Sequence, residues 1–198
     1  QVGNGTALTS LSTAAVSGLV GNYYNTTNFT GPAIAVAVSN INFPDFYAPG
    51  VLPSGIAPDG YLSIEWTGVL VPDFSENYTF SCINDDMLQV NLTINGNSTT
   101  VLNSTSPNNT NFVGSTVALT KGVAYPITVR FVENGGRPGA AYATLRWSSS
   151  SVGSNVTIPG SNFLTTNTSS TQFNGGGVKT TGAQTYNDAV TLGAATTL

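Results

Sequence analysis

The chain has 198 residues, of which only 7% are charged: five are Lys or Arg, nine are Asp or Glu, and none is histidine. A net charge of −4 without a basic cluster argues against binding to nucleic acid or to an anionic membrane surface. No stretch of about eighteen apolar residues is present to span a bilayer. A single cysteine, Cys82, excludes an intramolecular disulfide, and its neighbours Phe80 and Ile83 predict that it is a small buried side chain.

Short apolar runs of strand length, separated by turn signals, predict an all-β fold. In chain order the predicted strands cover residues 33–38, 61–66, 78–83, 87–94, 117–119, 125–132 and 141–147. Asn95-Gly96 follows an alternating run and predicts a two-residue hairpin. No segment of ten or more residues combines helical periodicity with caps. Several short strands at this spacing indicate an antiparallel β-sandwich or a barrel.

The two ends of the chain differ in composition from residues 18–158, which we expect to form the folded body. Residues 1–17 are mostly small and predict an extended segment, and residues 159–177 predict a linker rich in Gly, Thr and Ser. Residues 178–198 alternate loosely and suit one or two strands. Since an isolated strand does not stay folded, the body or a neighbouring subunit would have to accept it by strand exchange; the alternative is a plain linker.

The polar surface is built from Ser, Thr, Asn and Gly, and it carries many Asn-x-Ser/Thr sequons. There are ten of them, beginning at Asn4, Asn25, Asn28, Asn77, Asn91, Asn97, Asn103, Asn108, Asn155 and Asn167. Their density predicts a secreted or cell-surface glycoprotein. The alternative is a bacterial secreted protein without glycans. Both interpretations are extracellular, and Gln1 would be the residue left after removal of a signal peptide.

Two adjacent acidic residues, Asp85 and Asp86, stand out in a chain with so little charge. Two neighbouring carboxylates repel each other unless water separates them or a cation lies between them. A hard cation such as Ca²⁺ binds clusters of carboxylate and amide oxygens. The alternative is a solvated loop between two strands, in which Asn-Asp-Asp is ordinary turn chemistry. The residues alone leave both interpretations open.

Five sequence blocks, in order, resemble the PA14 domain family, which is named from anthrax protective antigen. The blocks are Gly18-Leu-Val-Gly-Asn-Tyr-Tyr24 with Phe29-Thr-Gly31, Tyr61-Leu-Ser-Ile-Glu-Trp-Thr-Gly68, Glu76-Asn-Tyr-Thr-Phe-Ser81 with Asn84-Asp-Asp86, Leu119-Thr-Lys-Gly-Val-Ala-Tyr-Pro-Ile127, and Val132-Glu-Asn-Gly-Gly136 with Leu145-Arg-Trp147. Together they extend from Gly18 to Trp147. The resemblance implies a β-sandwich that often binds carbohydrate in adhesins, flocculins, glycosidase accessory domains and toxins.

The same resemblance implies a calcium site. In lectin-like members a pair of aspartates joined by a cis peptide bond holds a Ca²⁺ ion, which two sugar hydroxyls also ligate. Asp85 and Asp86 match that pair, and Asn134 matches the loop position that usually gives a further ligand. Two departures are present: Met87 replaces a common glycine, and Arg137 brings a cation near the expected metal. Arg137 would contact a sugar, pair with Glu133, or indicate that no calcium binds.

Aromatic residues divide into expected core and expected ligand contacts. Trp66 and Trp147 end strands and are predicted to be buried, as are Tyr23 and Tyr24 for the most part. Tyr47 and Tyr142 lie near predicted loops, so they are the better candidates for contacting a ligand. Together with Asp85, Asp86 and Arg137, Tyr142 completes the expected carbohydrate-binding set.

The residues argue against an enzyme. Without histidine there is no Ser-His or Cys-His nucleophile and no usual zinc site. A glycosidase needs two carboxylates on either side of a sugar, which adjacent residues do not provide, and Glu65, Asp73 and Glu76 suit solvated positions near strand ends. The expected function is a calcium-dependent carbohydrate-binding module of an adhesin, with glycans as partners.

The alternative is a structural subunit of an extracellular fibre or coat. Residues 180–193, Thr-Thr-Gly-Ala-Gln-Thr-Tyr-Asn-Asp-Ala-Val-Thr-Leu-Gly, resemble a unit repeated in bacterial filamentous adhesins. One copy does not predict a β-solenoid, but it is compatible with a homopolymer assembled through terminal strands.

Overall fold

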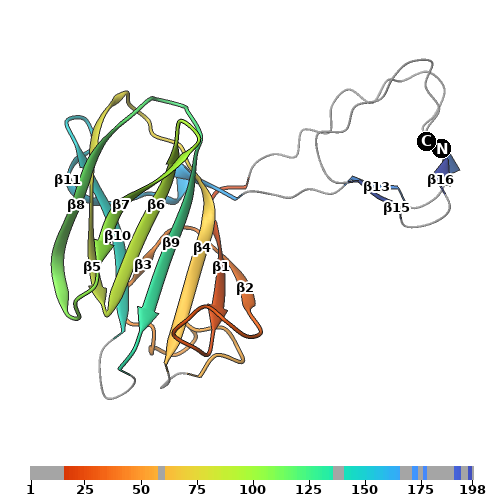
Figure 1. Ribbon diagram of the computed structural model, residues 1–198, viewed down its shortest axis with the longest axis horizontal. Helices are drawn as coiled ribbons and strands as arrows, with labels where there is room; N and C mark the ends of the chain where they lie inside the picture. The colour runs from red at the N-terminus through yellow and green to blue at the C-terminus, as the bar shows by residue number, and fades with distance from the viewer. Residues whose placement is uncertain are drawn as a thin grey trace. The chain divides into compact units, whose positions relative to one another are not determined.

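The computed structural model describes residues 16–57, 61–135 and 141–165, and the backbone of four short segments at 171–173, 176–177, 190–192 and 196–197. The chain divides into two compact units: Val16–Thr166, and Gln1–Ala15 together with Asn167–Leu198. The first unit is a sandwich of two β-sheets (Figure 1). The predicted all-β, antiparallel sandwich is therefore confirmed.

The larger sheet has six strands in a continuous order and a seventh at its side. Across the sheet these are β2 (Ile34–Val38), β1 (Leu19–Tyr24), β4 (Leu62–Leu70), β9 (Tyr125–Glu133), β6 (Met87–Ile94) and β7 (Asn97–Ser104), with β12 (Phe163–Leu164) beside β4. Every pairing is antiparallel. In β4 and β9 buried residues alternate with more exposed ones along most of the strand, as expected for a sheet with one face on a core.

The smaller sheet packs against this one. Its order is β11 (Gly153–Thr157), β10 (Tyr142–Ser149), β5 (Glu76–Asp85) and β8 (Asn109–Leu119), with β3 (Asn42–Phe43) beside β10. A short 3-10 turn, η1 (Gly160–Asn162), precedes β12. Between β5 and β6 the chain passes from the smaller sheet to the larger one, and Asp86 alone separates the two strands. This tight crossing fixes the position of the candidate site.

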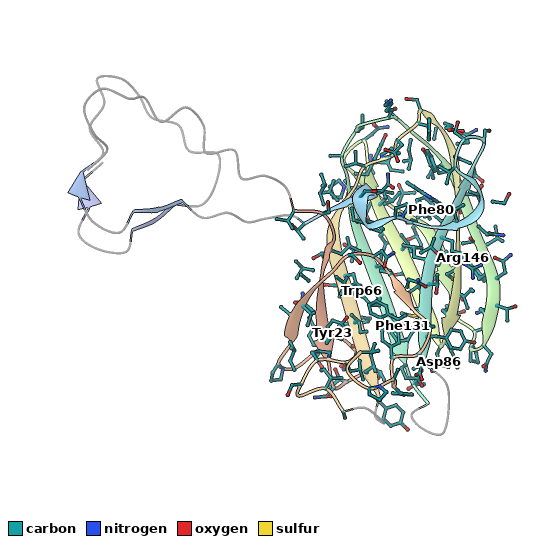
Figure 2. All side chains as sticks on the ribbon, turned by 180° about the vertical axis from the view of Figure 1, so that it is seen from behind. Tyr23, Trp66, Phe80, Asp86, Phe131 and Arg146 are labelled. Carbon is teal, nitrogen blue, oxygen red and sulfur yellow. The ribbon has the colours of Figure 1, made fainter. Side chains whose placement is uncertain are left out.

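Large aromatic side chains fill the space between the sheets. Trp66 is fully buried and packs against Phe46 and Phe131, with ring centroids 6.3 Å apart in both cases. Trp147 is 1% exposed, and its ring lies 4.8 Å from that of Tyr78. The prediction that both tryptophans belong to the core is confirmed. Figure 2 places Trp66 and Phe131 together inside the sandwich.

The sequence missed strands whose composition is polar. β7 and most of β8 consist largely of Ser, Thr and Asn. β8 is exposed along much of its length and β7 lies at the margin of its sheet, so neither strand needs the apolar pattern by which strands were predicted. Only residues 117–119 of β8 were expected. The hairpin between β6 and β7 is confirmed: Asn95 and Gly96 have φ values of 51° and 78°, both positive as a type I′ turn requires.

The described part of the second unit consists of short parallel strand pairs. β13 (Thr171–Phe173) pairs with β15 (Val190–Leu192), and β14 (Gly176–Gly177) pairs with β16 (Thr196–Thr197). The predicted extended segment at 1–17 lies outside the described residues except for its last two positions. Among the residues that the structure describes, no helix is long and apolar enough to cross a membrane.

Candidate functional site

Asp85 and Asp86 lie at one end of the sandwich, where the chain passes from β5 to β6. Figure 2 labels Asp86 at this end. The peptide bond between the two residues is cis, the geometry that the family resemblance implies. Asp85 is buried, with 6% of its surface exposed, and Asp86 is half-buried. The pair is therefore not the solvated loop that the sequence left open as an alternative.

Backbone amides from two different loops hold the two carboxylates. The amide of Asn108, in the β7–β8 loop, donates to Oδ1 of Asp85 at 2.9 Å. The amide of Asn134, which follows β9, donates to Oδ2 of Asp86 at 2.7 Å. Hydrogen bonds from amides to a carboxylate are charge-assisted and stronger than neutral ones. Each carboxylate is consequently oriented by a separate strand connection.

The loop before β8 is shaped so that the amide of Asn108 meets Asp85. Asn108 has a φ of 57°, in the left-handed region that asparagine tolerates better than most residues. The side-chain amide of Asn109 donates to Oγ of Ser104 at 2.7 Å and to the carbonyl oxygen of Ser106 at 2.5 Å. These bonds fix the loop at both ends of its turn.

Asn84 supports the aspartate pair from inside the protein. Its side chain is fully buried, and Nδ2 donates to the carbonyl oxygen of Asp86 at 2.6 Å. Its Oδ1 accepts a hydrogen bond from Sγ of Cys82 at 3.0 Å. Burial raises the pKa of Cys82 to about 12, so its sulfur stays protonated and keeps donating at neutral pH. The prediction that Cys82 is a buried side chain is confirmed, and the structure adds this hydrogen bond.

The electrostatics of the site favour a bound cation. Burial raises the pKa of Asp85, the amide of Asn108 acts in the opposite direction, and the charge and side chain of Asp86 add to the rise. Burial also raises the pKa of Tyr142, which pairs with Asp85 across β10 and β5, and the charge of Asp85 contributes. Asp85 is buried and Asp86 is half-buried, and the charge of Asp86 raises the proton affinity of Asp85. A positive charge bound beside the two carboxylates would therefore be stabilising.

The donor set fits a hard cation. Among the described residues, one oxygen of each aspartate accepts an amide hydrogen bond, and the two carboxylates lie close enough to interact with each other. In the same part of the chain no three His, Cys, Asp or Glu side chains gather into a metal-binding group. A cation here would take two carboxylates, with its other oxygens coming from amides, carbonyls, water or a ligand. Calcium accepts such mixed sets of about six to eight oxygens.

The structure describes two of the other predicted site residues, Asn134 and Tyr142. Asn134 is exposed and reaches the pair through its backbone amide. Tyr142 is half-buried at the first position of β10, beside Asp85. Arg137 lies outside the described residues. Met87, where the family often has glycine, begins β6 and pairs with Val132 of β9.

Two expectations about single residues are wrong. Tyr47, considered as a ligand contact, is only 6% exposed and belongs to the core. Glu65, expected near a strand end, lies in the middle of β4; it is at the surface, as expected, where Oε2 accepts a hydrogen bond from Nε of Arg130 at 2.7 Å. Tyr47 was judged by its closeness to a predicted loop and Glu65 by its closeness to a predicted strand end. Burial and strand register decided their places instead.

Most of the sequon asparagines have exposed side chains. This holds for Asn25, Asn28, Asn77, Asn97, Asn103, Asn108 and Asn155. Asn91 is half-buried, and its Oδ1 accepts a hydrogen bond from Thr100 at 2.6 Å. Asn4 and Asn167 lie outside the described residues. The exposed asparagines are accessible to modification, and Asn108 lies directly beside the aspartate pair.

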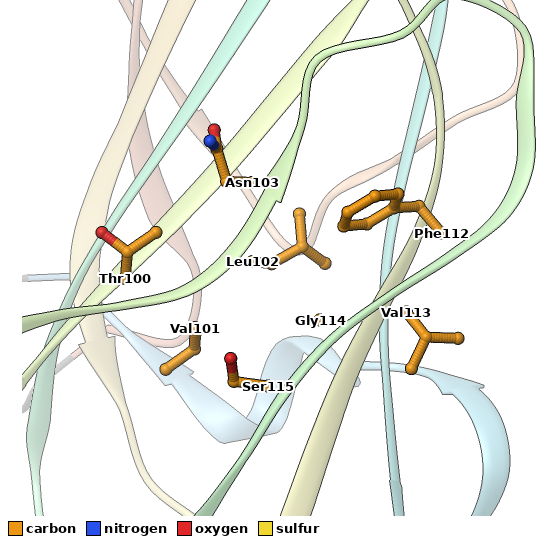
Figure 3. Close-up of a pocket in the computed structure, with 8 residues that line it drawn as sticks. All are labelled: Thr100, Val101, Leu102, Asn103, Phe112, Val113, Gly114 and Ser115. Carbon is orange, nitrogen blue, oxygen red and sulfur yellow. The ribbon is translucent and has the colours of Figure 1, made fainter.

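A groove of about 320 Å³ lies elsewhere, between β7 and β8 (Figure 3). It is lined by Thr100, Val101, Leu102, Asn103, Phe112, Val113, Gly114 and Ser115, none of which is charged. β8 comes close to β7 here because Gly114 has no Cβ, which would overlap the carbonyl oxygen of Val101. Neither Asp85 nor Asp86 lines this groove, and its lining has no charged side chain. The candidate site is therefore the aspartate pair and not the groove.

Sequence reasoning named Asn134 but missed the other two residues that hold the aspartates, Asn84 and Asn108. Asn84 directly precedes the pair, and this position alone made it a candidate. That its side chain points inward depends on strand alternation and on the bulge of β5 opposite β8, which the sequence does not show. Asn108 is 23 residues from Asp85, and only the pairing of β5 with β8 brings the two together. The positive φ of Asn108, unlike that of Asn95 in its Asn-Gly turn, belongs to no local motif that the sequence shows.

Known proteins share the sandwich fold of this chain. A family model of the PA14 domain matches residues 15–160. The comparison with curated proteins gives no match.

Solved structures resemble the sandwich. The chain is 29% identical to an anti-sigma factor domain-containing protein, with a TM-score of 0.65 over 77% of this chain and 49% of that one, so it spans about half of that protein's length. The PA14 domain of the antifreeze protein MpAFP is 13% identical, with a TM-score of 0.60 over 81% of this chain and 96% of that one. A PA14 sugar-binding domain from an RTX adhesin is 18% identical, with a TM-score of 0.55 over 76% and 99%. The family match covers most of the sequence, and this chain belongs to the PA14 domain family.

Proposed function

We propose that the sandwich binds carbohydrate outside the cell or at its surface, through a calcium ion held by Asp85 and Asp86. One observation carries the proposal: two adjacent carboxylates, one buried and one half-buried, each held by a backbone amide from a different loop at one end of the sandwich. The likeness to a PA14 sugar-binding domain from an RTX adhesin supports the choice of ligand.

The residues of the chain have separate roles in this proposal. Asp85 and Asp86 supply the negative charge, and the amides of Asn108 and Asn134 keep the two carboxylates from rotating away from each other. The side-chain amide of Asn84 donates a hydrogen bond to the carbonyl oxygen of Asp86 and so fixes the position of that carbonyl group. When bound, calcium would supply a hard Lewis acid on which sugar hydroxyls replace water. Asn134, in the loop after β9, is proposed to give a further oxygen ligand.

Sugar specificity is proposed to come from side chains around the pair. Tyr142 lies next to Asp85 across the β10–β5 pairing, so its hydroxyl is placed to hydrogen-bond a sugar at the metal. Arg137 is proposed to contact the sugar as well. A sugar bound here would meet two acidic groups and one aromatic ring, a combination that suits vicinal hydroxyls.

Binding is a better interpretation of this site than catalysis. Asp85 and Asp86 are neighbours held toward one point, whereas glycoside hydrolysis needs two carboxyl groups about 5 Å or more apart on either side of the sugar. The chain has no histidine to serve as a general base. The pair is suited to holding a cation and a ligand in place.

Calorimetry and a glycan array test the proposal together. Titration of the metal-free protein with CaCl₂ is expected to give one site that EGTA reverses, and array binding is expected only with calcium. Asp86→Asn should abolish both signals. Asp73→Asn, a carboxylate at the other end of the sandwich whose Oδ2 accepts from Asn162, is the matched control and should change neither. Calcium-independent glycan binding, or binding that survives in Asp86→Asn, would contradict the proposal.

A further inference from the structure

The loop that holds Asp86 contains an Asn-Gly dipeptide. Asn134, whose backbone amide donates to Oδ2 of Asp86 at 2.7 Å, is followed by Gly135. In such a dipeptide the backbone nitrogen of the glycine can attack the side-chain amide of the asparagine, because glycine has no Cβ to hinder the approach. Among the described residues this dipeptide occurs at one other place, Asn95-Gly96 in the β6–β7 hairpin. The fold holds the two dipeptides in different ways.

A neighbouring side chain contacts the backbone amide of Gly135. The N–H of Gly135 donates to Oε1 of Glu133 at 2.9 Å. A Cβ on residue 135 would lie 3.2 Å from the same oxygen, so glycine permits this close approach. The side chain of Glu133 therefore places an acceptor within reach of the hydrogen that Gly135 loses when its nitrogen forms a new bond.

The attack at Asn134 leaves the neighbouring strand in place. Asn134 and Gly135 are both exposed, whereas Glu133 is buried and pairs with Leu62 at the end of β9. Rotation about the Cα–C bond of Asn134 moves Gly135 and does not move β9 or the N–H of Asn134. The hydrogen bond from Asn134 to Asp86 is therefore compatible with the reaction.

The same attack at Asn95 would break a hairpin. Asn95 and Gly96 form a two-residue turn with φ values of 51° and 78°, closed by the pairing of Ile94 with Asn97. Nδ2 of Asn97 also donates to the carbonyl oxygen of Asn95 at 3.2 Å. Rotation that brings the nitrogen of Gly96 to the side chain of Asn95 changes the backbone angles on which this turn depends. The fold therefore disfavours the reaction at Asn95 and permits it at Asn134.

We propose that Asn134 is a site of spontaneous deamidation, which adds a third carboxylate beside Asp85 and Asp86. The nitrogen of Gly135 forms a bond to Cγ of Asn134, the Cγ–Nδ2 bond breaks, and ammonia leaves with the hydrogen that Gly135 has lost. The product is a cyclic succinimide. A water molecule from the solvent then adds to one of the two ring carbonyl carbons, the bond from that carbon to the ring nitrogen breaks, and residue 134 becomes aspartate or isoaspartate.

Either product changes the charge at the aspartate pair. The new carboxylate belongs to the residue whose N–H binds Asp86, and neither product alters that N–H group. A third negative charge increases repulsion among the carboxylates when no cation is bound. It increases the affinity for a hard cation, because calcium affinity depends on the number of charged ligands. This effect on affinity rests on the calcium site proposed above, whereas the deamidation itself does not.

Peptide mass spectrometry of the folded, calcium-free protein during incubation at neutral pH tests the site. We expect Asn134 to deamidate about tenfold or more faster than Asn95, because Asn95 reacts only when its hairpin opens locally. In urea, where neither loop is folded, the two rates should become similar. Gly135→Ala is expected to suppress deamidation at Asn134 and to leave the rate at Asn95 unchanged.

Three results would overturn the proposal. The first is equal rates at the two asparagines in the folded protein, and the second is a faster rate at Asn95. The third is a difference that persists in urea, since local sequence and not the fold would then decide which asparagine reacts.

Calorimetry with CaCl₂ tests the effect of the new carboxylate. Asn134→Asp reproduces one product and is expected to raise calcium affinity by about 3- to 30-fold. Asn95→Asp makes the same change of charge at the far end of β6 and is the matched control, which should leave the affinity unchanged. Equal affinities for the two variants would overturn the effect on the site. If the parent protein binds no calcium, the proposed function fails, and the rates of deamidation still decide whether Asn134 is the modified residue.

Discussion

The two ends of the sandwich hold their carboxylates in similar ways, yet among the described residues only one end has two adjacent aspartates. At the end where β5 begins, the amide of Ser151 donates to Oε2 of Glu76 at 3.2 Å, and Asn162 donates to Oδ2 of Asp73 at 2.9 Å. At the end where β5 finishes, backbone amides hold Asp85 and Asp86. Donors on a carboxylate are therefore not distinctive. The distinctive feature is that the second pair is adjacent and burial raises the pKa of Asp85.

The comparison extends to two buried asparagines. Asn84 donates to the carbonyl oxygen of Asp86 at 2.6 Å, and Asn162 donates to the carbonyl oxygen of Val71 at 2.9 Å. Both side chains are almost fully buried, at 0% and 2% exposure. They provide a natural control for each other, because one supports the aspartate pair and the other supports the opposite end.

Loss of one aspartate of the pair should have the largest effect. Asp85→Asn and Asp86→Asn each remove a charged ligand while keeping an oxygen that accepts the loop amide. We expect calcium affinity to fall by on the order of 100-fold or more in calorimetry. Glu76→Gln, at the opposite end, should leave the affinity unchanged. A similar loss in Glu76→Gln would mean that the two ends do not differ as we describe.

Substitution of each buried asparagine should distinguish a residue that stabilises only the fold from one that also stabilises the calcium site. Asn84→Ala and Asn162→Ala each leave a partly buried carbonyl group without its side-chain donor, which costs about 1–3 kcal/mol of the free energy of unfolding, measured with urea. Only Asn84→Ala should also weaken calcium binding, by about 10- to 100-fold, because it frees the carbonyl group of Asp86. Equal calcium affinities in the two variants would remove Asn84 from the site.

A smaller effect is expected at Tyr142. Tyr142→Phe removes the hydroxyl beside Asp85 and keeps the ring. If the hydroxyl contacts sugar, glycan affinity should fall by about 3- to 15-fold, the value of one hydrogen bond, with calcium affinity unchanged. Surface plasmon resonance with a glycan found on the array measures the first, and calorimetry measures the second. A drop in calcium affinity alone would place Tyr142 with the metal and not with the sugar.

The smallest effect concerns pH in the calcium-free protein. Burial raises the pKa of Asp85 above its ordinary value of 3.8, so the folded state binds this proton more readily than the unfolded state does. Its contribution to stability is fully present below 3.8 and is lost as pH rises through the raised pKa. Asp85→Asn should therefore gain stability relative to the parent protein as pH increases from about 4 to 7. Urea unfolding at several pH values measures this difference, and parallel curves for the two proteins would contradict it.

The sequence predicted those parts of the molecule that depend on local pattern. Apolar runs located most of the strands that line the core, although β1 was not among the predicted strands, and Asn95-Gly96 located a hairpin, because turn chemistry acts over neighbouring residues. The aspartate pair was visible because charge is rare in this chain. β7 and most of β8 were missed, since polar strands at the margins of a sandwich lack an apolar pattern.

The surroundings of the pair were beyond local pattern. The amide donors from Asn108 and Asn134 reach the aspartates over 23 and 48 residues, through strand pairings that no short motif specifies. Tyr47 was also misjudged from local pattern: it lies near a predicted loop, yet its side chain is buried in the core. Register, more than residue type, decides which side chains meet at this site.

Amide chemical shifts during a calcium titration test the difference between the two ends most directly. The amides of Asn108 and Asn134 hold Asp85 and Asp86, and the amide of Ser151 holds Glu76 in the same way at the other end. In ¹H–¹⁵N spectra the first two should shift together, saturate at one equivalent of calcium and return on addition of EGTA, while Ser151 stays in place. Shifts of equal size at Ser151, or no saturable shift at Asn108 and Asn134, would contradict a calcium site at this pair.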